Sequence, residues 1–549
     1  MKKCYLSEVD KNYSFNEDLV LGPWCFKDII SASKAECMEA YEGEDLAALH
    51  QQLYTLGINL LIKDADLIDE EKRQIFLLKN QYEYLYFVFF GFYLFSLIKK
   101  TLSVYPVQSI AFEKVSKPAE MQSLSSYLDP TYFGYLAMQI IEVILKNEQT
   151  NWFTPESNAK EMVERDILQP AQKLLTRIKN KLNYFSDIRG IYFIQGLLLT
   201  IIYKVRNLQG KRKPNYFIDH PALKINTEIL EFIEIFRELF SNYKIKEDSY
   251  VYNNKSKKLH ISTPGKLIFS EKLSDVVYRD YLVGKTNLCI IQHGGMYGFL
   301  HNCFRHEIEY NFPSFISWGT ETYSNIAGRN IINHLPSPHL NEIKDLYVFD
   351  NQEKISWIAG GIGRCGDGLE YMSASQGVVY YKKKLKLFNN LDHGLARKLI
   401  YKSFSLKHSS ILFEDPLLNE IPKIQQISTE ITAITLMLNS KFSIMDYMGT
   451  PFYEAMSMNA PVVLCLCQRQ YSLFTDTAAK LLKEFEKLGV VHSDPQKAAV
   501  FINSLHEKNV EEWWQSEGIQ DLRLRFIEMY ANNKPYFWPW AKAILKREI

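Results

Sequence analysis

The chain lacks an excess of charge of either sign. Its 64 lysine and arginine residues are matched by 63 acidic residues, which leaves a formal net charge of +1 over 549 residues. Proteins that bind nucleic acid through their overall charge carry a broad basic surface. The near balance of charge therefore argues against nucleic acid as a partner.

The chain is also poor in cysteine, and its first residues contain no apolar stretch. The eight cysteines are scattered, and none forms a Cys-x-x-Cys pair. Such usage is typical of proteins kept in a reducing compartment. The start, Met1-Lys-Lys-Cys-Tyr5, lacks the apolar segment of a secretory signal peptide. Both observations predict a cytoplasmic protein.

Long apolar runs are absent as well. The longest covers residues 84–98, and it is shorter than the roughly 20 residues that a membrane-spanning helix needs. We predict a buried helix there, with a helix lying in the membrane interface as the alternative. Basic clusters at 211–213 and 382–386 and an aromatic segment at 536–540 favour weak, peripheral association with the inner membrane. A solvated loop is the simpler interpretation of each basic cluster.

The composition is that of a globular protein with more than one core. Hydrophobic residues make up 47% of the chain, and 549 residues exceed what one core usually serves. Apolar residues recur at helical spacing between 132 and 208, whereas strand-like and helical patterns alternate from 267 onward. This alternation predicts a parallel sheet covered by helices. We predict strands at 287–291, 314–318, 346–349, 354–359, 377–382, 409–413 and 462–467, and helices at 297–309, 392–404, 428–438, 452–458, 471–488 and 495–505.

These patterns predict an α/β fold. We expect a helix-rich N-terminal domain over residues 1–280 and a Rossmann-like domain over 281–510. Aromatic helices over 511–549 are expected to pack back on the body, although an aromatic tail resting on a membrane is an alternative.

A glycine-rich turn follows the strand predicted at 287–291. It reads Gln292-His-Gly-Gly-Met-Tyr-Gly298, and the carboxyl end of a parallel strand is where open α/β sheets bind ligands. Gly294 and Gly295 would let a backbone approach a phosphate or carboxylate, and the first amides of a following helix would attract it. A tight turn without a ligand is the alternative.

A second motif runs from Asp446 to Val463. Gly449 and Thr450 form a turn into a helix, Pro451 suits the first helical position, and Thr450 can donate a hydrogen bond to a phosphate. Glu454 lies one turn further, where a carboxylate can accept hydrogen bonds from both ribose hydroxyls. A capped helix with a favourable acid near its start is the alternative. This order of turn, helix, Glu and Pro-Val-Val resembles the nucleotide-sugar half of glycosyltransferases with the two-domain GT-B fold.

A wider resemblance spans most of the chain. In sequence order its elements are Leu21-Gly-Pro-Trp-Cys25, the turn at 292–298, His306-Glu307 with Ser317-Trp-Gly319, the Thr450 and Glu454 block, and Trp513-Trp514. Together they resemble a family of transferases found in bacterial O-antigen and surface-carbohydrate gene clusters. The resemblance implies a GT-B-like fold, with two Rossmann-like domains facing a cleft. The segment Tyr310-Asn-Phe-Pro-Ser-Phe-Ile316 departs from the sequence usual in the family, which argues against a catalytic role for that loop.

Three residues are candidates for proton transfer: His293, His306 and Glu307. Glycosyl transfer needs a base for the acceptor hydroxyl or a nucleophile, together with donors that hold the leaving phosphate. His306 and Glu307 are adjacent on a helix, so their side chains point about 100° apart and one of them should be structural. A metal site formed by His301, Cys303 and His306 with His293 is disfavoured, because positions 301, 303 and 306 share no helix face.

A third glycine-rich segment follows the strand predicted at 354–359. It runs from Gly360 to Gly368 and contains Arg364, which would suit a phosphate or carboxylate grip. A surface loop is an equally good interpretation. Glu414-Asp415 also lies at a strand end, although an Asp before a proline is most often a turn residue.

The combined interpretation is a cytoplasmic glycosyltransferase of surface glycans. It would take a nucleotide-activated sugar as its donor and pass it to a glycan or lipid-linked glycan. By analogy with other surface-glycan enzymes of this layout, the expected donor is a CMP-linked ulosonic acid such as Kdo or a nonulosonate. We expect no cofactor and no metal. A nucleotide-sugar epimerase of the same fold and a non-catalytic scaffold that binds glycans are the rival hypotheses.

Overall fold

The structure is a computed structural model. It describes residues 1–7, 9, 13–14, 17–26, 31, 34, 46–66, 70–116, 130–146, 150–154, 188–207, 227–241, 259–262, 281, 287–301, 303–310, 312, 314–321, 331–350, 352–365, 374–404, 413, 415, 417, 425–426, 431–471 and 473–546.

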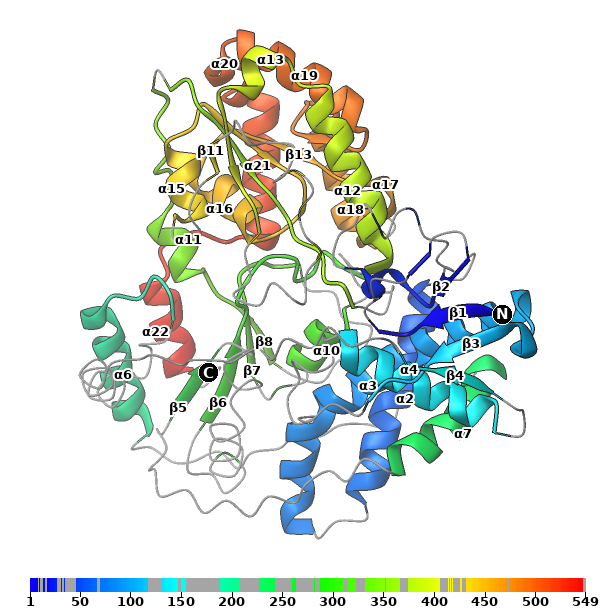
Figure 1. Cartoon of the computed structure of the whole chain (residues 1–549). Helices are drawn as coiled ribbons and strands as arrows, with labels where there is room; N and C mark the ends of the chain where they lie inside the picture. Colours follow the sequence, from blue (N-terminus) through cyan, green and yellow to red (C-terminus); the bar gives the residue numbers. More distant parts are fainter. Residues whose placement is uncertain are drawn as a thin grey trace, which may run out of the picture.

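Three parallel sheets organise the described residues (Figure 1). The first has the order β2-β1-β3-β4, with β1 at Lys2–Tyr5, β2 at Leu19–Val20, β3 at Ile110–Glu113 and β4 at Asn151–Phe153. The second runs in sequence order, with β5 at Leu259–Ser262, β6 at Asn287–Ile291, β7 at Ser314–Ser317 and β8 at Ile331–His334. The α/β class and the parallel sheets agree with the sequence-based prediction, whereas the two-domain GT-B arrangement stays a prediction.

Four helices share a hydrophobic core with the first sheet, α2 at Leu46–Ala65, α3 at Glu70–Val104, α4 at Pro130–Ile144 and α7 at Thr227–Ser241. Every residue from 84 to 98 in α3 is buried, as predicted. Within the described residues, the segment Tyr84–Val104 is long and apolar enough to cross a membrane, and 72% of its most apolar window is buried inside the protein. That burial favours a core helix.

Two helices pack against the second sheet. Helices α6 at Phe193–Asn207 and α22 at Phe537–Leu545 share one hydrophobic core with β6 and β7. The largest core continues from the first sheet through α3 to Tyr297, Ile308 and Phe315 and on to Ile362 and Tyr380. Strand β5 pairs with β6, so the expected boundary at residues 280 and 281 falls between two paired strands.

The third sheet has the order β11-β10-β9-β12-β13-β14. Its strands are β9 at Ile355–Ile358, β10 at Leu399–Lys402, β11 at Gln425–Gln426, β12 at Phe442–Met445, β13 at Val462–Cys465 and β14 at Val491–His492. Numbered within this sheet, the order is 3-2-1-4-5-6, which is that of the doubly wound dinucleotide-binding fold. The switch point, where successive connections leave in opposite directions, therefore lies between β9 and β12.

Helices surround the third sheet, and α21 runs back along it from the C-terminal region (Figure 1). They are α11 at Pro338–Glu342, α12 at Ala374–Asn389, α13 at His393–Ala396, α15 at Ala433–Leu438, α16 at Thr450–Met458, α17 at Gln468–Tyr471, α18 at Asp476–Lys487, α19 at Pro495–Glu507, α20 at Val510–Trp514 and α21 at Glu517–Tyr530.

Some predicted elements were wrong. Residues 377–382 form part of α12 and not a strand, because the buried positions Gly377, Tyr380, Tyr381, Lys384 and Leu387 follow helical spacing. Residues 346–349 are irregular. The helix predicted at 392–404 is the short α13 followed by strand β10.

The helix predicted at 297–309 begins only at Phe304, as α10 (Phe304–Tyr310). Met296 and Gly298 have φ angles of 79° and 73°, and this left-handed backbone cannot continue a right-handed helix. Residues 297–300 instead form a turn that meets Phe474 through Leu300.

Candidate functional site

The glycine turn after β6 packs against the start of helix α16. The Gly295 amide donates to Thr450 Oγ1 at 3.1 Å, and the Met296 amide donates to the Tyr453 hydroxyl at 2.8 Å. A Cβ atom on Gly295 would lie 2.5 Å from the Tyr453 ring, and one on Gly294 would lie 2.8 Å from Thr450 Oγ1. The absence of side chains on these two glycines therefore allows the turn to pack closely against α16. Contact of Gly294 and Gly295 with a substrate stays a prediction.

His293, in the same turn, belongs to a chain of hydrogen bonds. The Tyr297 hydroxyl lies 2.7 Å from His293 Nδ1 and donates to the Glu309 carboxylate. Because the single hydroxyl proton goes to Glu309, the hydroxyl oxygen accepts from Nδ1–H of His293. This leaves Nε2 of the neutral imidazole with its lone pair, which is the tautomer that a general base needs.

The electrostatic setting keeps both histidines of this cluster neutral. Burial of the ring and then the positive charge of Arg305 lower the pKa of His293 to about 4. The His306 ring stacks on Tyr297 with centroids 3.9 Å apart, and burial, Arg305 and His293 lower its pKa well below the usual value. His293 as a whole residue is exposed to solvent even though its ring loses part of its hydration, so the side chain can meet a ligand.

Glu307 is buried, whereas His306 is half-buried. The carboxylate that reaches Tyr297 is that of Glu309, also buried on α10. Sequence reasoning named Glu307 and missed Glu309, and no sequence signal separates the two acids. A catalytic role for His306 or Glu307 stays a prediction.

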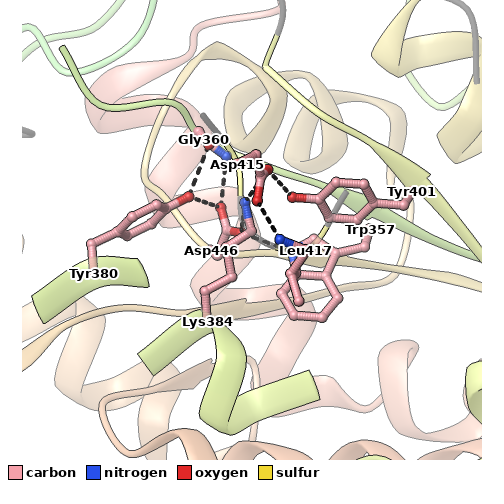
Figure 2. Close-up of polar contacts among 8 residues, drawn as sticks. All are labelled: Trp357, Gly360, Tyr380, Lys384, Tyr401, Asp415, Leu417 and Asp446. Carbon is pink, nitrogen blue, oxygen red and sulfur yellow. Dashed lines mark hydrogen bonds and ion pairs between the residues drawn. The ribbon is translucent and has the colours of Figure 1, made fainter. Parts of the chain in front are cut away.

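A second polar cluster lies beside the switch point of the third sheet, between β9 and β12 (Figure 2). Asp446, directly after β12, accepts from the Gly360 amide at 2.7 Å and the Tyr380 hydroxyl at 2.8 Å through Oδ1. Its Oδ2 accepts from Trp357 Nε1 at 2.8 Å. Three hydrogen bonds therefore fix this carboxylate, and through it the backbone at Gly360.

Lys384 joins Asp446 to a second carboxylate. Its Nζ lies 2.8 Å from Asp415 Oδ2 and 3.5 Å from Asp446 Oδ2, and its side chain is fully buried. Asp415 also accepts from the Tyr401 hydroxyl and from the Leu417 amide, the latter at 3.1 Å. Buried charges need such partners because their loss of hydration is costly.

The tyrosines in this cluster stay protonated donors. Burial, followed by the charge of Asp446, raises the pKa of Tyr380 well above its usual value. Burial and then Asp415 do the same for Tyr401. The sequence favoured a turn role for Asp415, and the structure adds that its carboxylate belongs to this buried network. Lys384, which the sequence placed in a basic cluster, is buried inside the protein.

Arg364 lies beyond the glycines that follow β9. Its buried Nη2 donates to the backbone carbonyl of Trp24 at 2.8 Å. Trp24 in turn donates from Nε1 to the Leu6 carbonyl at 2.9 Å. The guanidinium thus links the third sheet to the Leu21–Cys25 segment beside the first. Its predicted role in phosphate binding stays a prediction.

Helix α16 begins at the predicted turn. Gly449 is the N-cap residue, and a Cβ there would lie 2.3 Å from the Tyr447 ring. Glu454 is buried, with Oε1 2.8 Å from His339 Nε2 and 3.6 Å from Arg189 Nη1. Its carboxylate therefore already has two basic neighbours, and its predicted contact with a ribose stays a prediction.

Two aromatic rings lie near the switch point. Phe404 follows β10 by two residues and is 42% exposed, and Tyr447 follows β12 by two residues. Their ring centroids are 6.4 Å apart in an edge-to-face arrangement. A Cβ on Gly361 would lie 2.8 Å from the Phe404 ring. The sequence analysis missed this pair, because one aromatic residue in each of two separate loops gives no sign that the two rings meet.

Within the described part of the chain, no three His, Cys, Asp or Glu side chains are grouped so that they could hold a metal ion. His301, Cys303 and His306 are all described.

Comparison with known families assigns the class of activity. A family model described as LIC12162 family transferase matches residues 95–545. The chain belongs to the LIC12162 transferase family. The family match contains the His293 turn, the Asp446 cluster and the start of α16, whereas the Leu21–Cys25 segment lies before it. No curated protein matches the chain.

Proposed function

We propose that this LIC12162 family transferase is a GT-B-like glycosyltransferase. It moves a sugar from a nucleotide-activated donor to a glycan acceptor of the bacterial surface, and a CMP-linked ulosonic acid is the donor that we favour. The observation that carries the proposal is the 3-2-1-4-5-6 strand order of the third sheet, which has its glycine loops at the switch point.

The nucleotide would bind at the carboxyl ends of β9 and β12. Asp446 holds the Gly360 backbone there, and α16 presents its N-terminal end at Gly449, where a phosphate is favoured. The exposed Phe404 ring offers a flat apolar surface on which a nucleobase can stack. Residues Gly361, Phe404 and Tyr447 would thus join Gly449 and Thr450 in holding the donor.

The acceptor would bind next to His293. This residue lies in the same turn as Gly295, whose amide donates to Thr450 of α16, so the base and the donor site are joined by direct contacts. With Nδ1–H given to Tyr297, Nε2 can take the proton of an acceptor hydroxyl as that oxygen attacks the anomeric carbon. The proposal needs no metal, because amides at the helix start would face the leaving phosphate.

A thermal-shift panel of CMP, UDP, GDP, dTDP and ADP tests the donor site. A nucleotide at roughly 100 times its dissociation constant should stabilise the folded protein by about 2.7 kcal/mol. Phe404→Ala should abolish that stabilisation. Leu346→Ala is the matched control, because Leu346 has a similar exposure of 48% and lies beside the C-terminal end of α16, whereas the phosphate would bind at its N-terminal end. If none of the nucleotides stabilises the protein, the scaffold hypothesis gains and the proposal fails.

Activity with and without acceptor separates the two enzyme hypotheses. A glycosyltransferase consumes the donor that the panel identifies only when a glycan acceptor is present. An epimerase converts the donor alone. His293→Ala should remove acceptor-dependent turnover while leaving the nucleotide-induced stabilisation intact.

A further inference from the structure

Helix α6 has an apolar stripe on its outer side. Ile194, Leu198, Ile201 and Val205 follow one another at intervals of four, three and four residues, and each is 46–69% exposed. The opposite side of the helix, which includes Leu199, is buried in the core with the second sheet. Apolar residues at this spacing are typical of a helix face that packs against something.

Helix α22 also carries exposed apolar side chains. It packs beside α6 at the edge of the molecule (Figure 1), and both helices share one core with strands β6 and β7. Trp540 and Ile544 of α22 are buried in that core, whereas Trp538 and Leu545 are 75% and 59% exposed. We call the six exposed apolar residues the α6–α22 face: Ile194, Leu198, Ile201, Val205, Trp538 and Leu545.

The charged residues of these two helices are basic, and one exposed acid, Glu342, lies beside the start of α6, where it accepts a hydrogen bond from Tyr192. Neither α6 nor α22 contains an acidic residue. Lys204, Lys542 and Lys546 lie on the exposed sides of the two helices. Exposed aliphatic side chains, an exposed tryptophan and neighbouring lysines form the combination that inserts into the interface of an anionic bilayer. A protein partner would fit the apolar residues alone, but the lysines favour a negatively charged surface.

We propose that the α6–α22 face binds an anionic lipid surface. The inference goes beyond the transfer reaction, because it concerns a surface formed by the second sheet's covering helices and not by the switch point of the third. It would hold the second sheet, and with it the His293 turn, near a bilayer.

Vesicle flotation with the full-length protein tests the proposal. The vesicles are pure phosphatidylcholine or phosphatidylcholine with about a quarter phosphatidylglycerol, a composition whose negative charge attracts lysine. We expect the protein to float with the anionic vesicles only. The double variant Ile194→Glu with Trp538→Glu should lower the partition coefficient about tenfold or more, since it removes two insertable side chains and adds negative charge.

Val500→Glu is the matched control. Val500 lies on α19 beside the third sheet and is 70% exposed, which equals the exposure of Ile194 within one percentage point. The control should float as well as the unaltered protein. Because all three substituted side chains are exposed, each variant should keep the melting temperature of the unaltered protein.

Three outcomes would overturn the proposal. They are absence of flotation, equal flotation with neutral and anionic vesicles, and equal loss in the Val500→Glu control. A dimer in the absence of vesicles that Ile194→Glu converts to a monomer, without any flotation, would assign the face to a second copy of the chain.

Discussion

The Tyr297 hydroxyl lies 2.7 Å from Nδ1 of His293, and its proton goes to the buried Glu309 carboxylate. The acid therefore acts on the imidazole through a phenol and not by direct contact. This arrangement orients the ring and selects its tautomer without placing a negative charge against it. Tyr297 is thus a positioning residue for the proposed base.

Tyr297→Phe should lower kcat about tenfold and leave KM for the donor nearly unchanged, because the base loses its orientation but the nucleotide site stays intact. His293→Ala should cost more, roughly 100-fold or beyond, because it removes the base itself. The measurement is steady-state kinetics with each substrate varied. A Tyr297→Phe enzyme with unaltered kcat would exclude the positioning role.

The pH profile offers a separate check on His293. Since its pKa is lowered to about 4, the imidazole stays neutral as the pH falls from 8 to 5, a range in which an ordinary histidine with a pKa of about 6.5 gains a proton. We expect kcat/KM to lack an acid limb near pH 6.5 from this group. A limb centred there that disappears in His293→Gln would contradict the assignment.

Asp446→Asn should destabilise the third sheet by about 2–4 kcal/mol, because the amide nitrogen cannot accept from Gly360 or Trp357 and Lys384 loses one buried counter-charge. Tyr380→Phe should cost less, about 1 kcal/mol. The two effects should not add, because the Tyr380 hydroxyl donates to the same carboxylate that the Asp446 substitution changes. Urea unfolding of the single and double variants measures the coupling, and strictly additive losses would contradict it.

His50 should make the folded protein sensitive to acid. Its ring is buried beside Phe89, and burial lowers its pKa to about 3. Between pH 6.5 and 3 the unfolded chain binds a proton that the folded protein refuses, so stability falls as the pH falls through this window. His50→Leu should reduce that slope by up to about 1.4 kcal/mol per pH unit. The free energy of unfolding at several pH values gives the slope, and identical slopes would refute the prediction.

Gly295→Ala should destabilise the contact between the glycine turn and α16 by about 1–3 kcal/mol, since the new methyl group would overlap the Tyr453 ring. Gly394→Ala is the control. Gly394 lies in helix α13, where an added Cβ meets nothing within 4 Å, so alanine there should be neutral or slightly stabilising. Equal effects of the two substitutions would show that the turn tolerates a side chain.

The sequence predicted those elements whose residues carry their own local signal. The strand at Asn287–Ile291 and the turn and helix from Gly449 were found because an apolar run, glycine and proline mark them. Helix α12 was mistaken for a strand because its buried stripe includes Lys384, which looks polar in sequence and is satisfied only by Asp415 and Asp446 far along the chain.

The candidate site was predictable only in part, for a similar reason. Gly294 and Gly295 were recognised, but the partner that approaches them is Thr450 and Tyr453, about 155 residues later, and no local pattern reveals it. Glu309 reaches Tyr297 only because Met296 and Gly298 turn the backbone before α10. Contacts that depend on tertiary geometry leave no recurring spacing pattern in the sequence.

The hydrogen bond from Arg364 to Trp24 spans 340 positions. During translation, Trp24, whose carbonyl accepts this hydrogen bond, is synthesised long before Arg364. The third sheet therefore cannot bury this cation with its acceptor until the N-terminal segment has reached its final place. The order of synthesis favours a chain whose early part folds first and serves as the surface on which the late part is completed.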